Sequence, residues 1–248
     1  MVYTAHYDTQ PVLPFPNFIT PKNIFVYILF NIAIVIGFFA VTFAIGFVFG
    51  TVTALIGLSA DIAYYASMII LYGLIFMMII APANKHTAND NTSGVTTVLD
   101  IMAELPQNQQ EKAAFVLFDL EEAGLWGSLS FASKHKSVKK NKLFINFDCV
   151  SDGETILFAL KRTTKKYAEL LEKAFVPTAD LTVEITKNAF YPSDNASFKG
   201  GIGVAALKKS KLFGTLYMDR IHTNKDVIYR EENIQFLTNG AIKLAQML

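Results

Sequence analysis

Residues 113–128 read AAFVLFDLEEAGLWGS, an apolar run that ends in acidic residues before a helix-like pattern begins. A short apolar run with aromatic and β-branched residues predicts a buried strand over residues 113–120, and the apolar spacing of residues 124–135 predicts a helix. A strand followed directly by a helix is the repeating unit of α/β folds. The stretch therefore predicts an α/β fold with carboxylates at the end of a strand.

The same alternation of strands and helices runs along the rest of the chain. Residues 2–8 predict a strand by their alternating β-branched and aromatic side chains, and residues 142–150 predict another. Because strands separated by helices form largely parallel sheets, we predict a mixed, largely parallel sheet sandwiched by helices. The further predicted elements are strands at residues 155–160, 182–185, 204–207 and 215–218, and helices at residues 95–105, 165–175 and 231–248.

Acidic and imidazole side chains gather at the carboxyl ends of these strands, where sheets of this kind bind their ligands. His6 and Asp8 end the first strand, Glu121 and Glu122 the next, and Asp148 the one after. Singly, each motif has an ordinary interpretation as a hydrogen-bonded histidine, a helix cap or a turn. Gathered at one edge, such groups would repel one another unless cations lay between them. Imidazole and carboxylate ligands without a cysteine cluster favour zinc.

Two ions would fit the number of ligands in the sequence. A pair about 3.5–4 Å apart needs one bridging carboxylate, further ligands on each ion and room for a shared hydroxide. Asp90 and His222 add a carboxylate and an imidazole to the strand-end groups. Glu121 and Glu122 can divide the roles of ligand and proton acceptor, because successive side chains at a strand end diverge.

The apolar residues are concentrated in residues 23–83. Hydrophobic residues make up 52% of the chain, and Asp61 is the one ionisable side chain of this block besides its tyrosines. Residues 24 to about 50 and residues 62–81 each reach the length of about 20 residues that crosses a membrane. Residues 51–61 predict a turn between them. We predict a two-helix transmembrane hairpin.

The hairpin divides the chain into a peptidase-like domain of residues 1–22 and 84–248 and an insertion of residues 23–83. A signal peptide is the poorer interpretation, because the block lacks a basic segment before it and contains two apolar runs. A very apolar helix pair inside a soluble domain is the other alternative. Lys22 and Lys85 flank the domain side of the hairpin, so the positive-inside rule places the catalytic domain in the cytoplasm.

Charge and cysteine content exclude two other classes. The net charge of +1 argues against nucleic-acid binding, and the single cysteine, Cys149, argues against a disulfide-stapled secreted scaffold. The lipid bilayer and a peptide substrate are the predicted partners, and no oligomeric state is predicted.

The amino-acid sequences of five segments resemble those of a known protein family. They read Ala5-His6-Tyr7-Asp8, Ala88-Asn89-Asp90-Asn91-Thr92-Ser93-Gly94, Phe118-Asp119-Leu120-Glu121-Glu122-Ala123-Gly124-Leu125-Trp126-Gly127-Ser128, Asn146-Phe147-Asp148 and Ile221-His222-Thr223. In order and wording they resemble the zinc aminopeptidase family of bacterial leucyl aminopeptidase and aminopeptidase Y. The resemblance covers nearly all of the chain outside the hairpin.

This resemblance implies a centre with two zinc ions and a role for each residue. Glu121 matches the general base, which relays a proton from a metal-bridged hydroxide to the leaving amine. Asp8 matches a carboxylate that orients a ligand histidine. The implied activity is an aminopeptidase. The implied ligands are Asp90 as the bridge, His6 and Asp148 on one ion, and Glu122 and His222 on the other.

Three features depart from the family pattern. Asn195 stands where the family has a histidine; it is a candidate substrate-binding residue that can donate a hydrogen bond but cannot titrate. The hairpin lies between His6 and Asp90, where the family has a short loop, which motivates the hypothesis that substrates are membrane-associated. The family also has strands and a helix ahead of the strand that carries His6. The sequence lacks them here, so we expect either that it is truncated or that the hairpin compensates for the missing edge strands.

The substrate pocket is harder to assign. Tyr191, near Asn195, is a candidate hydrogen-bond donor to substrate, or a buried structural tyrosine. Cys149 and Ile221 adjoin two ligands, so they line an apolar pocket or simply pack at the sheet edge. We expect a preference for apolar N-terminal residues. Two other functions fit the residues: a non-catalytic membrane receptor or scaffold with the peptidase fold, and a glutaminyl cyclase with a single zinc.

Overall fold

A seven-stranded mixed sheet forms the centre of the part of the chain that the computed structural model describes, residues 1–13, 15, 17–212 and 214–248, with side chains described except at residues 60, 78 and 79. The strand order is β2-β1-β3-β6-β4-β5, with β7 beside β6. The strands are β1 (Val2–His6), β2 (Ala114–Phe118), β3 (Phe144–Phe147), β4 (Thr155–Ala159), β5 (Thr182–Thr186), β6 (Gly201–Lys209) and β7 (Leu216–Tyr217).

Most neighbouring strands of the sheet are parallel. β1 pairs in parallel with β2 and β3, as do β3 with β6 and β4 with β5, whereas β4 and β7 run antiparallel to β6. The prediction of a mixed, largely parallel sheet is confirmed. His6, the last residue of β1, pairs with Phe118, the last residue of β2. The segments that follow these strands therefore leave the sheet at the same edge.

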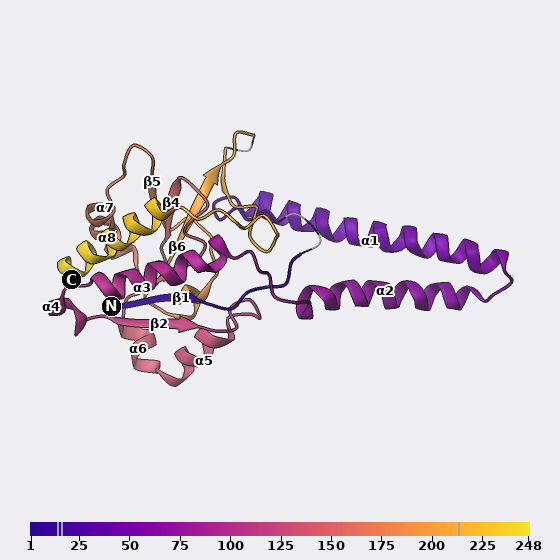
Figure 1. The fold of residues 1–248 in the computed structure, drawn as a ribbon, viewed down its shortest axis with the longest axis horizontal. Coiled ribbons are helices and arrows are strands. Elements are labelled where there is room, and N and C mark those ends of the chain that lie inside the picture. Colours follow the sequence, from indigo (N-terminus) through magenta and orange to yellow (C-terminus); the bar gives the residue numbers. More distant parts are fainter. Residues whose placement is uncertain (14, 16, 213) are drawn as a thin grey trace.

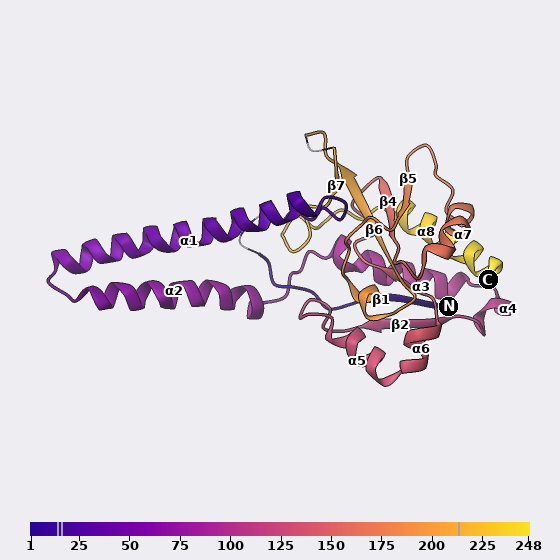
Figure 2. The same ribbon diagram turned by 180° about the vertical axis from the view of Figure 1, so that it is seen from behind.

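Helices cover both faces of the sheet, as Figure 1 and Figure 2 show. One core joins Tyr3 of β1 to Ile101 of α3 and Leu237 of α8, and the opposite core joins Val2 of β1 to Ala132 of α5. Adjacent residues of β1 enter different cores because successive side chains of a strand point to opposite faces. The helices outside the hairpin are η1 (Ala88–Ser93), α3 (Gly94–Glu104), α4 (Gln107–Gln110), α5 (Trp126–Lys134), α6 (Lys136–Asn141), η2 (Lys165–Tyr167), α7 (Ala168–Ala174), η3 (Asp194–Ser197) and α8 (Glu231–Met247).

The remaining two helices, α1 (Ile24–Leu55) and α2 (Ala60–Ile80), form a hairpin that extends away from the sheet (Figure 1). The prediction that the first helix ends near residue 50 is wrong. Thr51 and Thr53 donate their hydroxyls to backbone oxygens of the same helix, so nothing interrupts it there. The helix ends just before Gly57, whose φ of +74° glycine adopts at little cost.

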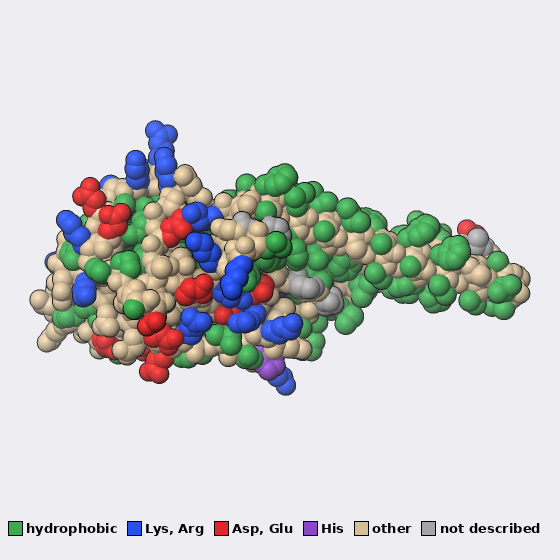
Figure 3. Space-filling model, turned by 90° about the horizontal axis from the view of Figure 1, so that it is seen from above, with side chains coloured by type: hydrophobic (Ala, Val, Ile, Leu, Met, Phe, Trp, Pro, Cys, Tyr) green, Lys and Arg blue, Asp and Glu red, His purple; other side chains and the backbone are tan. Residues whose placement is uncertain are grey.

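The surface of the hairpin is apolar. Figure 3 shows hydrophobic side chains along it, whereas lysine, arginine and acidic side chains gather on the sheet domain. Across the described residues, α1 is the one helix long and apolar enough to cross a membrane, with 32 residues and a mean hydropathy of 2.7 over an 18-residue stretch of it. The described part of α2, Asp61–Met77, is apolar but shorter. The second predicted span therefore stays a prediction.

The segments that flank the hairpin meet at one place on the domain. Pro11 and Ala83 pair as an isolated antiparallel bridge, and the backbone N–H of Asn84 donates to the oxygen of Gln10 at 3.0 Å. The chain leaves and returns beside the carboxyl end of β1, so the insertion does not interrupt the sheet. It does bring the base of α1 close to the strand-end carboxylates.

Candidate active site

His6 lies at the centre of the group of side chains beyond the sheet edge. Its ring is 1% exposed, and Nε2 lies 3.3 Å from Oδ1 of Asp90 and 3.6 Å from Oδ1 of Asp148. On the other side of the ring, Nδ1 lies 3.5 Å from Oδ1 of Asp8. The imidazole is therefore held between one carboxylate that can orient it and two that can share a metal ion with it.

His222 approaches the same group from the opposite end of the chain. Its Nε2 lies 2.8 Å from Oδ2 of Asp90 and 3.1 Å from Oε1 of Glu122. Asp90 thus presents one oxygen to each histidine. Three sets of possible ligand atoms lie within 4.8 Å of one another: His6 with Asp90 and Asp148, Asp90 with Glu122 and His222, and His6 with Glu121 and Glu122.

The buried carboxylates of this group need positive charge beside them, and a metal ion could supply it. Burial, together with the charge of Asp148, raises the pKa of Glu121 to about 9, and burial together with Asp90 raises the pKa of Glu122 to about 7. Burial would lower the pKa of His6, but its hydrogen bonds to carboxylates outweigh this and raise it. The site binds protons because it gathers more negative charge than it can hold uncompensated. Two imidazoles and four carboxylates form a donor set that suits zinc.

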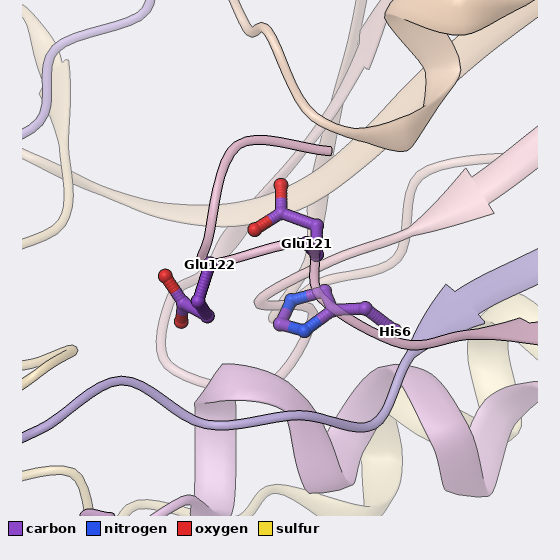
Figure 4. A group of neighbouring side chains, drawn as sticks. All are labelled: His6, Glu121 and Glu122. Carbon is purple, nitrogen blue, oxygen red and sulfur yellow. The ribbon is translucent and has the colours of Figure 1, made fainter. Parts of the chain in front are cut away.

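Asp8 links this group to the segment after β2. Its two oxygens accept hydrogen bonds of 3.1 Å from the backbone N–H groups of Glu121 and Glu122. Figure 4 shows both glutamates leaving this segment with their carboxylates held apart beside the ring of His6. Asp8 therefore contacts the imidazole through its backbone oxygen at 3.2 Å and its carboxylate at 3.5 Å, while the same carboxylate positions the two glutamates.

Asn91 ties the ends of two strands to the loop that carries Asp90. Its amide nitrogen donates to the backbone oxygens of His6 and Phe147, at 3.3 and 3.2 Å. Its oxygen accepts from the N–H of Cys149 at 3.1 Å and from that of Gly94 at 3.2 Å. These bonds satisfy backbone groups that the strand ends would otherwise leave unpaired.

Asp226 holds the other side of the same loop, and its role was not predicted from the sequence. Its carboxylate accepts hydrogen bonds from the N–H groups of Asn89 and Asp90, at 2.7 and 2.9 Å. Burial raises the pKa of Asp226 to about 6, although these bonds oppose the shift. Its position four residues after His222 is the one signal in the sequence, and it is too common to have identified it.

The predicted substrate residues separate into two groups. Cys149, Tyr191 and Ile221 line a pocket of about 210 Å³ together with the metal-site residues. The hydroxyl of Tyr191 donates to the backbone oxygen of Asp148 at 3.0 Å, which is a structural contact. Asn195 is buried in η3 outside this pocket, where its side-chain oxygen accepts from the N–H of Ser193 at 3.2 Å.

The segments that lead into and out of the hairpin hold the loop of His222. The N–H of Leu13 donates to the backbone oxygen of His222 at 2.9 Å, and the amide of Asn84 donates to that of Thr223 at 3.0 Å. The amide of Asn17 lies 3.4 Å from both Nδ1 of His222 and the oxygen of Ile221. A metal bound at Nε2 would leave the proton on Nδ1, and the amide oxygen of Asn17 could accept it after rotation of the amide, which would give up the bond to Ile221.

Replacing Asn17 with alanine should weaken zinc binding about 10- to 100-fold, the usual cost of losing a side chain that orients a metal ligand. Competition with a chromogenic chelator measures this affinity. Asn141→Ala is the control, because Asn141 is an exposed residue of α6. Equal zinc affinity of the Asn17→Ala variant and the wild type would contradict the role of Asn17.

Solved structures with similar folds include two from Legionella pneumophila. The LapA aminopeptidase is 16% identical with a TM-score of 0.48, and the match covers 68% of this chain and 47% of that one. LapB is 16% identical with a TM-score of 0.49, and the match covers 68% of this chain and 50% of that one. The chain spans about half the length of these structures.

A match to a protein family includes most of the candidate site residues. Residues 75–245, which are 171 of the 248 residues, match the family described as peptidase family M28. This region contains Asp90, Glu121, Glu122, Asp148 and His222, whose side chains line one pocket with His6. The zinc dependence of this family agrees with the donor set described above. The chain belongs to peptidase family M28.

Proposed function

We propose that the chain is an aminopeptidase that uses two zinc ions to hydrolyse the N-terminal peptide bond of its substrates. The observation that carries the proposal is the carboxylate of Asp90, which has one oxygen beside each histidine. His6 and Asp148 complete one set of three ligands around it, and Glu122 and His222 complete the other. Three protein ligands for each ion are typical of catalytic zinc sites, which keep a further position open.

The metal pair would supply two effects in this proposal. When bound, two zinc ions polarise the carbonyl of the scissile bond and lower the pKa of a water molecule between them. Asp90 would be the shared ligand, because its two oxygens face opposite sides of the group. Asp8 would keep the imidazole of His6 in the orientation that directs Nε2 at the metal.

Glu121 is the carboxylate left for proton transfer. It belongs to neither set built around Asp90, yet it lines the same pocket. Its burial and the charge of Asp148 raise its pKa, so it holds a proton more readily than an exposed glutamate. We assign it the proton of the attacking water and the delivery of that proton to the leaving amine.

Glu121→Gln should lower kcat about 10²- to 10⁴-fold, because an amide keeps the size of the side chain but cannot accept the proton. The zinc content of the Glu121→Gln variant should equal that of the wild type. The assay compares peptides with free and with acetylated amino termini, and the exposed Glu104→Gln is the control. Unchanged kcat would contradict the role of Glu121. Equal turnover of the two kinds of peptide would contradict an aminopeptidase.

We also propose that α1 and α2 both cross a membrane. Their apolar side chains are exposed along the hairpin, and small or weakly polar residues lie between the helices. A Cβ added to Gly46 would lie 3.0 Å from Oγ of Ser67, a close approach of the kind that small residues allow between membrane helices. The two lysines beside the hairpin, Lys22 and Lys85, favour a cytoplasmic domain. Substrates would then be peptides at the membrane surface.

Expressed at full length, the chain should sediment with membranes and resist extraction by alkaline carbonate, because a spanning hairpin is released only when detergent replaces the lipid. Immunoblots of the carbonate and detergent fractions measure this. Recovery of the chain in the carbonate supernatant would contradict the spanning hairpin, and a known peripheral protein in the same preparation serves as the control.

A further inference from the structure

The base of α1 forms one wall of the pocket that contains the metal-site residues. Ile24 and Tyr27, both in the first turn of α1, line this pocket together with Phe190. The carboxylates and histidines described above line the same pocket. The apolar helix that begins the hairpin is therefore also a part of the candidate active site.

This wall is fixed to the domain by contacts at several points. The N–H of Phe190 donates to the oxygen of Pro21 at 2.7 Å, and Ile19 and Met218 exchange backbone hydrogen bonds of 2.9 and 3.0 Å. Lys22 forms an ion pair with Glu184. The first turn of α1 follows directly on these contacts, so its side chains are held against the pocket.

The start of α1 is not needed to cross a membrane. With 32 residues and a rise of about 1.5 Å per residue, α1 is about 48 Å long. The hydrocarbon core is about 30 Å thick, and about 20 residues cross it. The hairpin turn lies at the far end of α1, so the surplus can extend the helix on the domain side. Ile24 and Tyr27 can then face substrate outside the hydrocarbon.

The pocket combines the carboxylates and histidines of the candidate metal site with apolar and aromatic side chains at the base of α1. Among the described lining residues there is no lysine or arginine, and Ile24, Tyr27, Phe190 and Ile221 are all apolar or aromatic. The pocket, at about 210 Å³, is smaller than the roughly 300–1,000 Å³ of sites for drug-sized ligands. It suits the side chain of one terminal residue better than a longer segment.

We propose that Ile24 and Tyr27 are specificity-determining residues that select substrates with a large apolar N-terminal residue. This inference rests on the proposed aminopeptidase function and assigns part of its substrate pocket to the base of the hairpin. The charged wall positions the terminal amine and the scissile bond, and the first turn of α1 contacts the side chain. A substrate with a small N-terminal side chain leaves Ile24 and Tyr27 uncovered, and one with an acidic side chain places a charge against them. The enzyme therefore binds the transition states of these substrates less well.

Tyr27→Ala tests this directly in the full-length protein, purified in detergent and assayed on leucyl, phenylalanyl, alanyl and glutamyl p-nitroanilides. The ratio of kcat/KM for the leucyl over the alanyl substrate should fall at least about tenfold, within the range of about 10- to 200-fold for lost apolar contacts. Tyr27→Phe should keep the ratio. Tyr72→Ala is the matched control, because Tyr72 is an exposed tyrosine of α2.

A second variant works by adding volume. Ile24→Phe should narrow the pocket and reduce kcat/KM for the phenylalanyl substrate more than for the alanyl one, even if Tyr27→Ala fails to fold. Unchanged ratios in both variants, with an active wild type, would overturn the inference and leave the proposed function standing. A wild type with full zinc that cleaves none of the four substrates would overturn the proposed function itself.

Discussion

The carboxylate of Asp90 lies between two histidines that are more than 200 residues apart in the sequence, and the rest of the site depends on this arrangement. Buried carboxylates at one sheet edge repel one another, and neither the sheet nor the loops around them remove that cost. Protons compensate part of it, as the raised pKa values of Glu121 and Glu122 indicate. A pair of divalent cations would compensate it more fully, because each would contact several of these oxygens at once.

The neighbouring backbone explains how so many charges stay in place. Asp8 connects β1 to the glutamates after β2, Asn91 connects the ends of β1 and β3, and Asp226 holds the N–H groups beside Asp90. Each of these side chains uses its oxygens or amide on backbone groups that strand ends and the η1 loop would otherwise leave unpaired. The same residues that complete the backbone hydrogen bonding therefore position the candidate metal ligands.

Local patterns predicted the sheet and most of the site. The apolar run at residues 113–120 and its following glutamates identify a strand end, and the parallel order of strands brings His6 and Asp148 to the same edge. Contacts between distant segments were not predictable. Asn17 reaches His222, and Asp226 reaches Asp90, through loops whose paths no periodicity describes. The first helix also runs beyond the predicted end near residue 50, and the hydroxyls of Thr51 and Thr53 find acceptors on backbone oxygens within it.

The insertion is more than an anchor in this account. The segments that flank it hold the loop of His222, and its first turn lines the pocket, so membrane attachment and substrate selection would share the same region. The central claim is that Asp90 bridges two ions. Anomalous diffraction at the zinc absorption edge from crystals of the metal-loaded protein tests it most directly. The account predicts two peaks about 3.5–4 Å apart, one on each side of the Asp90 carboxylate. A single peak, or peaks away from Asp90, would contradict it.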